Sequence, residues 1–238
     1  MYLHFLIRFI LIMKNAVHVL KKNLIPNFPK RDRKFFLLFG AGFFILFVIF
    51  TLIVRSDTLR QFDFDTTVRL QEHIPKKIDG FFSFLSVFGR FETSIVILLA
   101  ILIFKRKILG VVAFGLFGIA HIIEIIGKTL LSQPGPPHMF LRTHDLAAEF
   151  PGFYIHTDAS FPSGHAMRAL FLTTMIVFII WRSKKIYTEL KYILIGAVVL
   201  YTFLMTFSRV SLGEHWTTDV VGGLLLGASF AFLSLLFL

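Results

Sequence analysis

The chain has 238 residues, of which 56% are hydrophobic and 31 are Phe. A water-soluble domain of this length does not bury so much apolar surface, so the composition predicts a membrane protein. The absence of Cys excludes a disulfide framework, a thiolate metal site and a cysteine nucleophile, and the formal net charge is +11.

The N-terminal segment carries much of this charge. Residues 1–22 are apolar with basic interruptions, and Arg8 would lie in the middle of the membrane if they formed a span, which is costly. No small-residue cleavage site follows a clean apolar core, so we do not expect a cleaved signal peptide. We expect an N-terminal helix in the membrane interface and divide the chain into a basic cytoplasmic segment, residues 1–34, and a membrane domain, residues 35–238.

Six apolar stretches follow, with lengths that suit membrane-crossing helices. The sequence therefore predicts an all-α integral membrane bundle with spans at about 35–54, 88–104, 108–131, 162–181, 191–207 and 219–238. Residues 80–87 are expected along the interface. Residues 55–79 carry five basic and five acidic side chains, which predicts a solvated helical excursion.

The distribution of basic residues predicts the orientation of these spans. With the N-terminus inside, the inner segments 1–34, 105–107 and 182–191 hold fifteen Lys or Arg against two acidic residues. We therefore predict a multi-pass protein of the plasma or inner membrane with both termini in the cytoplasm. The surplus positive charge then faces anionic lipid headgroups and not nucleic acid.

The stretch between the last two spans holds a pattern that suits catalysis. Arg209 is a permanent cation that can hold phosphate through its planar guanidinium. Asp219 follows His215 by four residues, which on a helix places both on one face, where the carboxylate can accept the second imidazole N–H. His215 is therefore the candidate nucleophile. The same pattern also fits a polar loop with an interfacial Arg and His.

A second stretch, Phe161-Pro162-Ser163-Gly164-His165, lies where a loop enters an apolar run. Pro162 suits the first helical turn, and the backbone N–H groups that follow would form an anion site at a helix N-terminus. Ser163 adds a hydroxyl donor, Gly164 lets an anion approach the backbone, and His165 can donate a proton to a leaving group.

The third predicted span contains three ionisable residues, His121, Glu124 and Lys128, spaced to share one helical face. Ionisable groups inside a membrane helix indicate function by default. The alternative is that Glu124 and Lys128 only neutralise each other at a spacing of four residues. Both interpretations can hold, because Glu124 could position Lys128.

Together these stretches resemble the type 2 phosphatidic acid phosphatase family of membrane lipid phosphate phosphatases. The family motifs are Lys-x6-Arg-Pro, Pro-Ser-Gly-His and Ser-Arg-x5-His-x3-Asp. The second is complete at Pro162–His165, and the third is complete at Ser208, Arg209, His215 and Asp219. The resemblance covers roughly residues 55–238 in layout.

The first motif is only partial, because Lys128 is followed by Pro136 at the right distance but Gly135 stands at the arginine position. We consider two replacements for this arginine. Arg168 lies about one helical turn beyond His165, although it could instead be an interfacial residue that reaches toward water. Arg142 lies in the following loop, although it could be a solvated loop charge.

The resemblance implies a phosphohistidine mechanism. His215 would attack phosphorus, Asp219 would orient it, and His165 would protonate the leaving oxygen and then activate water. The phosphate oxygens would be held by Lys128, Arg209 and the Ser163–Gly164 backbone. We expect no metal or other cofactor, because cationic side chains take that role. His138, His144 and His156 are expected to be solvated loop residues.

Under the predicted topology the motif residues lie at the outer ends of spans three to six; these are Lys128, Ser163, His165, Arg209, His215 and Asp219. The leading hypothesis is a phosphatase acting at the outer face on a lipid phosphate or diphosphate, with undecaprenyl diphosphate preferred over phosphatidate and phosphatidylglycerophosphate. A lipid-linked phosphotransferase and a catalytically inactive lipid-binding relative remain open alternatives. A transporter is disfavoured because the halves show no repeat. The sequence gives no oligomeric state.

Overall fold

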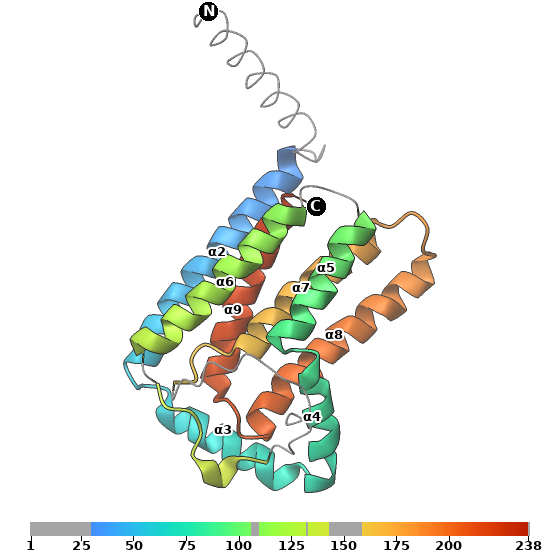
Figure 1. Ribbon diagram of the computed structural model, residues 1–238. Helices are drawn as coiled ribbons and strands as arrows, with labels where there is room; N and C mark the ends of the chain where they lie inside the picture. The colour runs from blue at the N-terminus through green and yellow to red at the C-terminus, as the bar shows by residue number, and fades with distance from the viewer. Residues whose placement is uncertain (1–29, 106–109, 132, 143–158, 238) are drawn as a thin grey trace, which may run out of the picture.

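The computed structural model describes residues 30–105, 110–131, 133–142 and 159–237. In these residues the chain is a bundle of α-helices, which confirms the predicted all-α class (Figure 1). The helices are α2 (Lys30–Arg55), α3 (Arg60–His73), α4 (Asp79–Val87), α5 (Phe91–Lys105), α6 (Gly110–Leu131), α7 (Gly164–Arg182), α8 (Thr188–Ser211) and α9 (Thr217–Leu235), with short 3-10 turns η1 (Lys76–Ile78) and η2 (His138–Phe140). The predicted interfacial helix near the N-terminus lies outside the described residues.

Five of the helices, α2, α6, α7, α8 and α9, are long and apolar enough to cross a membrane. The segments Lys76–Val87 (η1 and α4) and Phe91–Ile103 (in α5) meet at a bend of 49°. They form a sixth crossing if the two are counted as one span. The six apolar stretches of the sequence thus correspond to these elements. The second predicted span begins slightly early, because the chain breaks over residues 88–90 and α5 starts at Phe91.

Helix α3 corrects the expectation of a fully solvated excursion. Residues 60–73 are helical, as predicted, but Asp63 and Thr67 are buried because α3 packs against the ends of α8 and α9. Asp63 receives hydrogen bonds from the backbone N–H of Thr218 at 2.9 Å and from its hydroxyl at 2.6 Å. Burial raises the pKa of Asp63, although these bonds oppose the shift. A side chain of α3 thereby caps the first turn of α9.

Glycines bring α7 and α9 into direct backbone contact. A Cβ atom at Gly223 would lie 2.2 Å from the carbonyl oxygen of Ser163, and one at Gly227 would lie 2.4 Å from that of Met167. Small residues permit this approach between membrane helices. The pairing of 223 with 163 and of 227 with 167 means that the two helices run parallel, so both begin at the same end of the bundle.

Aromatic and aliphatic side chains fill the space beneath these helix starts. Phe161 is fully buried, stacks on Phe47 of α2 and packs against Gly222 of α9. On the far side of α7, Phe171 packs edge-on against Phe117 of α6. This apolar core holds the helices that carry the sequence motifs at a fixed spacing.

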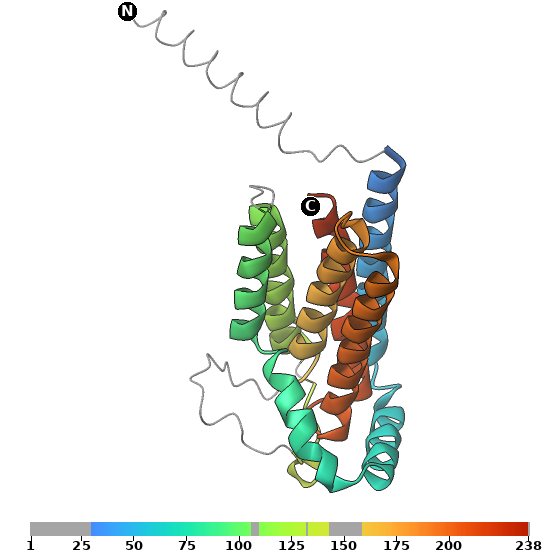
Figure 2. The same cartoon turned by 90° about the vertical axis from the view of Figure 1, so that its right-hand side faces the viewer.

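The motif residues gather at one end of the bundle. The last turns of α6 and α8 and the first turns of α7 and α9 lie together there, opposite the start of α2 and the end of α9 (Figures 1 and 2). Helices α3 and α4 lie at the same end. The fold therefore brings residues of all three motifs together at one end of the bundle.

Candidate active site

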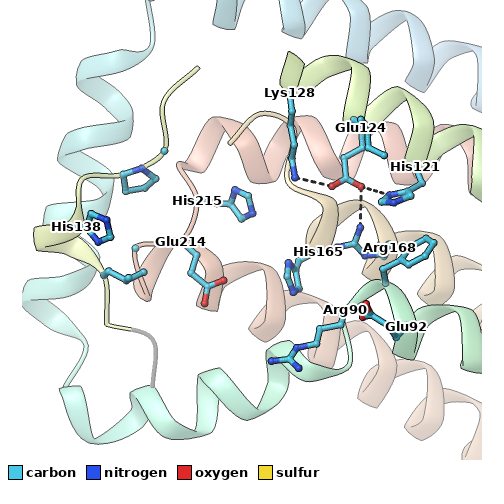
Figure 3. Close-up of a pocket in the computed structure, with 16 residues that line it drawn as sticks. Arg90, Glu92, His121, Glu124, Lys128, His138, His165, Arg168, Glu214 and His215 are labelled. Atoms are coloured by element: carbon cyan, nitrogen blue, oxygen red, sulfur yellow. Dashed lines mark hydrogen bonds and ion pairs between the residues drawn. The ribbon is translucent and has the colours of Figure 1, made fainter. Parts of the chain in front are cut away.

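A cavity of about 610 Å³ lies at this end of the bundle. Its wall combines the break before α5, the last turns of α6, the loop before η2, the start of α7 and the loop between α8 and α9 (Figure 3). The side chains used below that line it are Lys128, Glu124, His165, Arg168, Glu214 and His215.

The Glu124 carboxylate is the centre of an ionic cluster on one side of the cavity (Figure 3). Its Oε2 atom lies 2.8 Å from His121 Nδ1 and 3.0 Å from Arg168 Nη1, and its Oε1 atom accepts a hydrogen bond from Lys128 Nζ at 3.0 Å. The side chain of Glu124 is only 3% exposed. Glu124 therefore pairs with Lys128, as the spacing of four residues predicted, and this contact fixes the position of the Lys128 side chain.

Gly164 is required by the position of this carboxylate. A Cβ atom at residue 164 would lie 1.9 Å from Glu124 Oε1, so no other residue fits while Glu124 stays in place. The sequence suggested that a bound anion approaches the backbone at Gly164. In the structure the anion found against Gly164 is the side chain of Glu124.

Ser163 links the two complete motifs. Its backbone N–H donates to the carbonyl oxygen of Asp219 at 2.9 Å, and its hydroxyl accepts from Ala166 N at 3.5 Å, as the N-cap of α7. Pro162 consequently precedes the cap, and the expectation that it lies in the first helical turn is wrong. Ser163 is fully buried, which places its side chain behind the cavity wall.

His215 and Asp219 face each other at the start of α9. The Nδ1 atom of His215 lies 3.5 Å from Asp219 Oδ2, and Asp219 is fully buried. His215 lies outside the helix, because Trp216 is its N-cap and Asp219 Oδ2 accepts the Trp216 N–H at 2.8 Å. The spacing of four residues therefore brings the pair together across a helix start, not along one helix face.

Arg209 is buried beside this pair at the end of α8. Its guanidinium is 1% exposed, and Ser208 Oγ accepts from Nη2 at 3.2 Å. Its Nη1 forms an ion pair with the carboxylate of Glu214, the residue before His215. His165 lines the same cavity as His215, Lys128 and Arg168, so the two histidines and these basic side chains share one site.

The family model of the PAP2 superfamily matches residues 107–238, a stretch that contains all three motif regions and begins after α5. The chain belongs to the PAP2 superfamily.

Several known proteins are similar over more than half of this chain. An undecaprenyl-diphosphatase of Sulfolobus acidocaldarius is 28% identical over 203 residues, which cover 85% of this chain and 91% of that protein. Phosphatidylglycerophosphatase B of Bacillus subtilis is 29% identical over 143 residues, 58% of this chain and 63% of that protein. The crystal structure of a transmembrane PAP2 type phosphatidylglycerolphosphate phosphatase from Bacillus subtilis superposes with a TM-score of 0.65 at 19% identity, covering 83% of this chain and 94% of that one.

The two arginines considered as replacements for the one missing at Gly135 lie in different surroundings. Arg168 lines the cavity, where Nη1 pairs with Glu124 and Nε donates to the carbonyl oxygen of Gly89 at 2.9 Å. Arg142 instead donates to the carbonyl oxygens of Gln71 at 2.7 Å and Ile74 at 3.1 Å. It therefore secures the loop against the end of α3, and it is absent from the described cavity wall.

Several residues of this PAP2 site were not predicted as site residues. The cavity wall also includes Arg90, Glu92, His121, His138 and Glu214. The position of Glu214 immediately before the candidate nucleophile was the available signal. Arg90 and Glu92 could not be assigned from spacing, because they reach the cavity only through the break before α5. His144 and His156 lie outside the described residues.

Proposed function

We propose that this membrane phosphatase of the PAP2 superfamily hydrolyses a lipid phosphate or diphosphate through a phosphohistidine intermediate. The observation that carries the proposal is the placement of His215, backed by the buried carboxylate of Asp219, on the wall of a cavity that also presents His165, Lys128 and Arg168. A nucleophile, a proton donor and cations for phosphate oxygens then share one cavity.

The proposed chemistry has two steps. In the first, His215 Nε2 attacks phosphorus, since Nδ1 faces Asp219, and the leaving oxygen takes a proton from His165. In the second, His165 accepts a proton from water, the water oxygen attacks phosphorus, and the bond from phosphorus to Nε2 breaks to release phosphate. Asp219 holds the imidazole in the required tautomer and stabilises its positive charge.

Three basic side chains would bind the phosphate oxygens during both steps. Lys128 and Arg168 are held by Glu124, and Arg209 is held by Ser208. Their charges would stabilise the transition state in the way that a magnesium ion does in many phosphoryl-transfer enzymes. We therefore propose that the reaction needs no metal ion.

The proposed substrate is a polyprenyl diphosphate carrier, undecaprenyl diphosphate before phosphatidylglycerophosphate or phosphatidate. Support comes from the undecaprenyl-diphosphatase that is similar over most of both chains. The excess of basic residues in the predicted inner segments favours both termini in the cytoplasm and the site on the outer side. We further propose that residues 1–34 form a basic cytoplasmic segment and that residues 35–238 form the phosphatase domain.

Phosphate release by the purified protein in detergent tests this proposal. We expect release from undecaprenyl diphosphate in the presence of EDTA, at the rate seen without the chelator, and slower release from phosphatidate. A rate that disappears with EDTA and returns with a divalent cation would overturn the metal-independent mechanism. Release only after addition of an acceptor alcohol would identify a phosphotransferase, and no turnover by folded protein would favour an inactive lipid-binding relative.

Arg168 is expected to replace the arginine that the first motif lacks. Changing Arg168 to Ala removes one charge-assisted contact to phosphate, worth about 1.5–3 kcal/mol, so kcat/KM should fall about tenfold to a hundredfold. Gly135→Arg in the same background should restore part of this loss, because a Cβ atom at residue 135 meets only Ser160 Cβ, at 3.6 Å. Steady-state kinetics measures both effects.

The control for this experiment is Arg182→Ala, which removes an exposed arginine from the last turn of the same helix. A fall in kcat/KM for Arg168→Ala no larger than that of Arg182→Ala would show that Arg168 does not bind the substrate phosphate.

A further inference from the structure

The cavity wall is electrically balanced although its proposed substrate is an anion. Three basic side chains, those of Arg90, Lys128 and Arg168, line it together with three carboxylates, those of Glu92, Glu124 and Glu214. The formal charges of these six side chains cancel. A lipid phosphate therefore gains little net attraction from the wall unless one carboxylate leaves the phosphate position.

Two of these carboxylates, those of Glu124 and Glu214, form ion pairs with basic side chains that are proposed to bind phosphate. The two carboxylates differ in how firmly their surroundings hold them. Glu124 is 3% exposed, contacts three basic side chains and is packed against Gly164, so it has no space to withdraw. The side chain of Glu214 is 21% exposed and lies on the short loop between α8 and α9. Glu214 is therefore the carboxylate that can move.

Glu214 forms an ion pair with the arginine of the third motif. Arg209 has its Nε and Nη2 atoms directed at Ser208 Oγ, at 3.4 Å and 3.2 Å, and its Nη1 atom paired with Glu214. Glu214 lines the cavity, whereas Arg209 lies behind it. Carboxylate and phosphate oxygens bind a guanidinium with the same geometry, so Glu214 stands where a phosphate oxygen would bind Arg209.

Resting on the function proposed above, we propose that Glu214 is a positioning residue that takes the place of a phosphate oxygen on Arg209 in the empty site. Substrate phosphate displaces the Glu214 carboxylate and takes over its contact with Nη1. After hydrolysis the carboxylate returns and competes with inorganic phosphate for Arg209, which speeds release of the product. Glu214 thus keeps the buried guanidinium aligned between turnovers and sets the affinity of the site for phosphate.

Glu214→Gln tests this role because it keeps the shape of the side chain and removes its charge. Binding of inorganic phosphate to the full-length protein in detergent is measured by thermal stabilisation and as competitive inhibition of turnover. We expect the dissociation constant for phosphate and KM to fall about tenfold, with kcat reduced as product release slows. An unchanged dissociation constant would overturn the proposal.

Glu92→Gln is the matched control, since it removes the same charge from the wall of the same cavity without touching the Arg209–Glu214 pair. An equal gain in phosphate affinity from Glu92→Gln would mean that the gain comes from the lower negative charge of the cavity wall and not from the Arg209–Glu214 pair. That result would also overturn the proposal. Glu214→Asp keeps the charge on a shorter side chain, and its phosphate affinity should lie between wild type and Glu214→Gln. This second variant keeps the test decisive if Glu214→Gln does not fold.

The binding measurement separates this proposal from the proposed function. If the wild type binds inorganic phosphate but hydrolyses no lipid phosphate, the proposed function fails, while the affinities of the three variants still decide the role of Glu214. If turnover is present and the affinities do not change, the function stands and the role of Glu214 fails.

Discussion

Phosphate release from the lipid substrate should fall at least about a thousandfold in His215→Ala, because the covalent intermediate can no longer form. The structure leaves no obvious substitute, since His165 lies in the first turn of α7 and, among the described residues, has no carboxylate partner of the kind that Asp219 provides for His215. Radiolabelled phosphate retained on the protein after a rapid quench should be present in the wild type and absent from the variant.

His73→Ala is the control, since His73 is an exposed histidine of α3 that lies outside the cavity wall and bonds only locally, to the carbonyl oxygen of Arg69. It should retain the wild-type rate. Retention of more than about a tenth of that rate by His215→Ala would place the nucleophile elsewhere and remove the proposed mechanism.

The second large effect is expected on stability, from Glu124→Gln. Removing this charge leaves the cationic groups of Lys128 and Arg168 close together without the carboxylate that compensates both. Breaking a buried ion pair from one side costs about 3–5 kcal/mol. The midpoint of thermal unfolding in detergent should therefore fall strongly, and phosphate release should fall with it because both cations lose their positions.

Glu189→Gln provides the matched control, since it makes the same change at an exposed site in the first turn of α8. Its unfolding midpoint should stay close to that of the wild type. The double variant Glu124→Gln with Arg168→Gln should recover part of the lost stability, because it removes the uncompensated charge as well. If Glu124→Gln unfolds no earlier than Glu189→Gln, the cluster is not a stabilising element.

The positions of the membrane-crossing helices could be predicted from the sequence. Each of these helices corresponds to a run of apolar residues, which is a local property of the chain. Hydropathy places α2, α6, α7, α8 and α9 within a few residues of their observed ends. The i, i+4 spacing likewise predicts the contact of Glu124 with Lys128. Short-range spacing is enough wherever both partners lie on one helix or at one helix end.

The remaining parts of the site depend on contacts between segments that are far apart in the sequence. The spacing of residues along the chain does not reveal such contacts. The pairing of Arg168 with Glu124 joins α7 to α6, and the capping of Thr218 by Asp63 joins α9 to α3. At Gly164 the sequence likewise shows a small residue but not the Glu124 carboxylate that packs against it. Two alternatives, Arg142 and Arg168, could be separated only once their neighbours were known.

The backbone contact between α7 and α9 also restricts where a conformational change can occur. At Gly223 and Gly227 the neighbouring atoms of α7 are backbone atoms and the Cβ of Ala166, so no rotamer can adjust to let the helices slide, and the Ser163 N–H ties their first turns together. The distance between His165 and Asp219 is thereby fixed before substrate arrives. We therefore expect any opening of the site to use the loop that carries Glu214 and the break before α5, while His165 and Asp219 keep their relative positions.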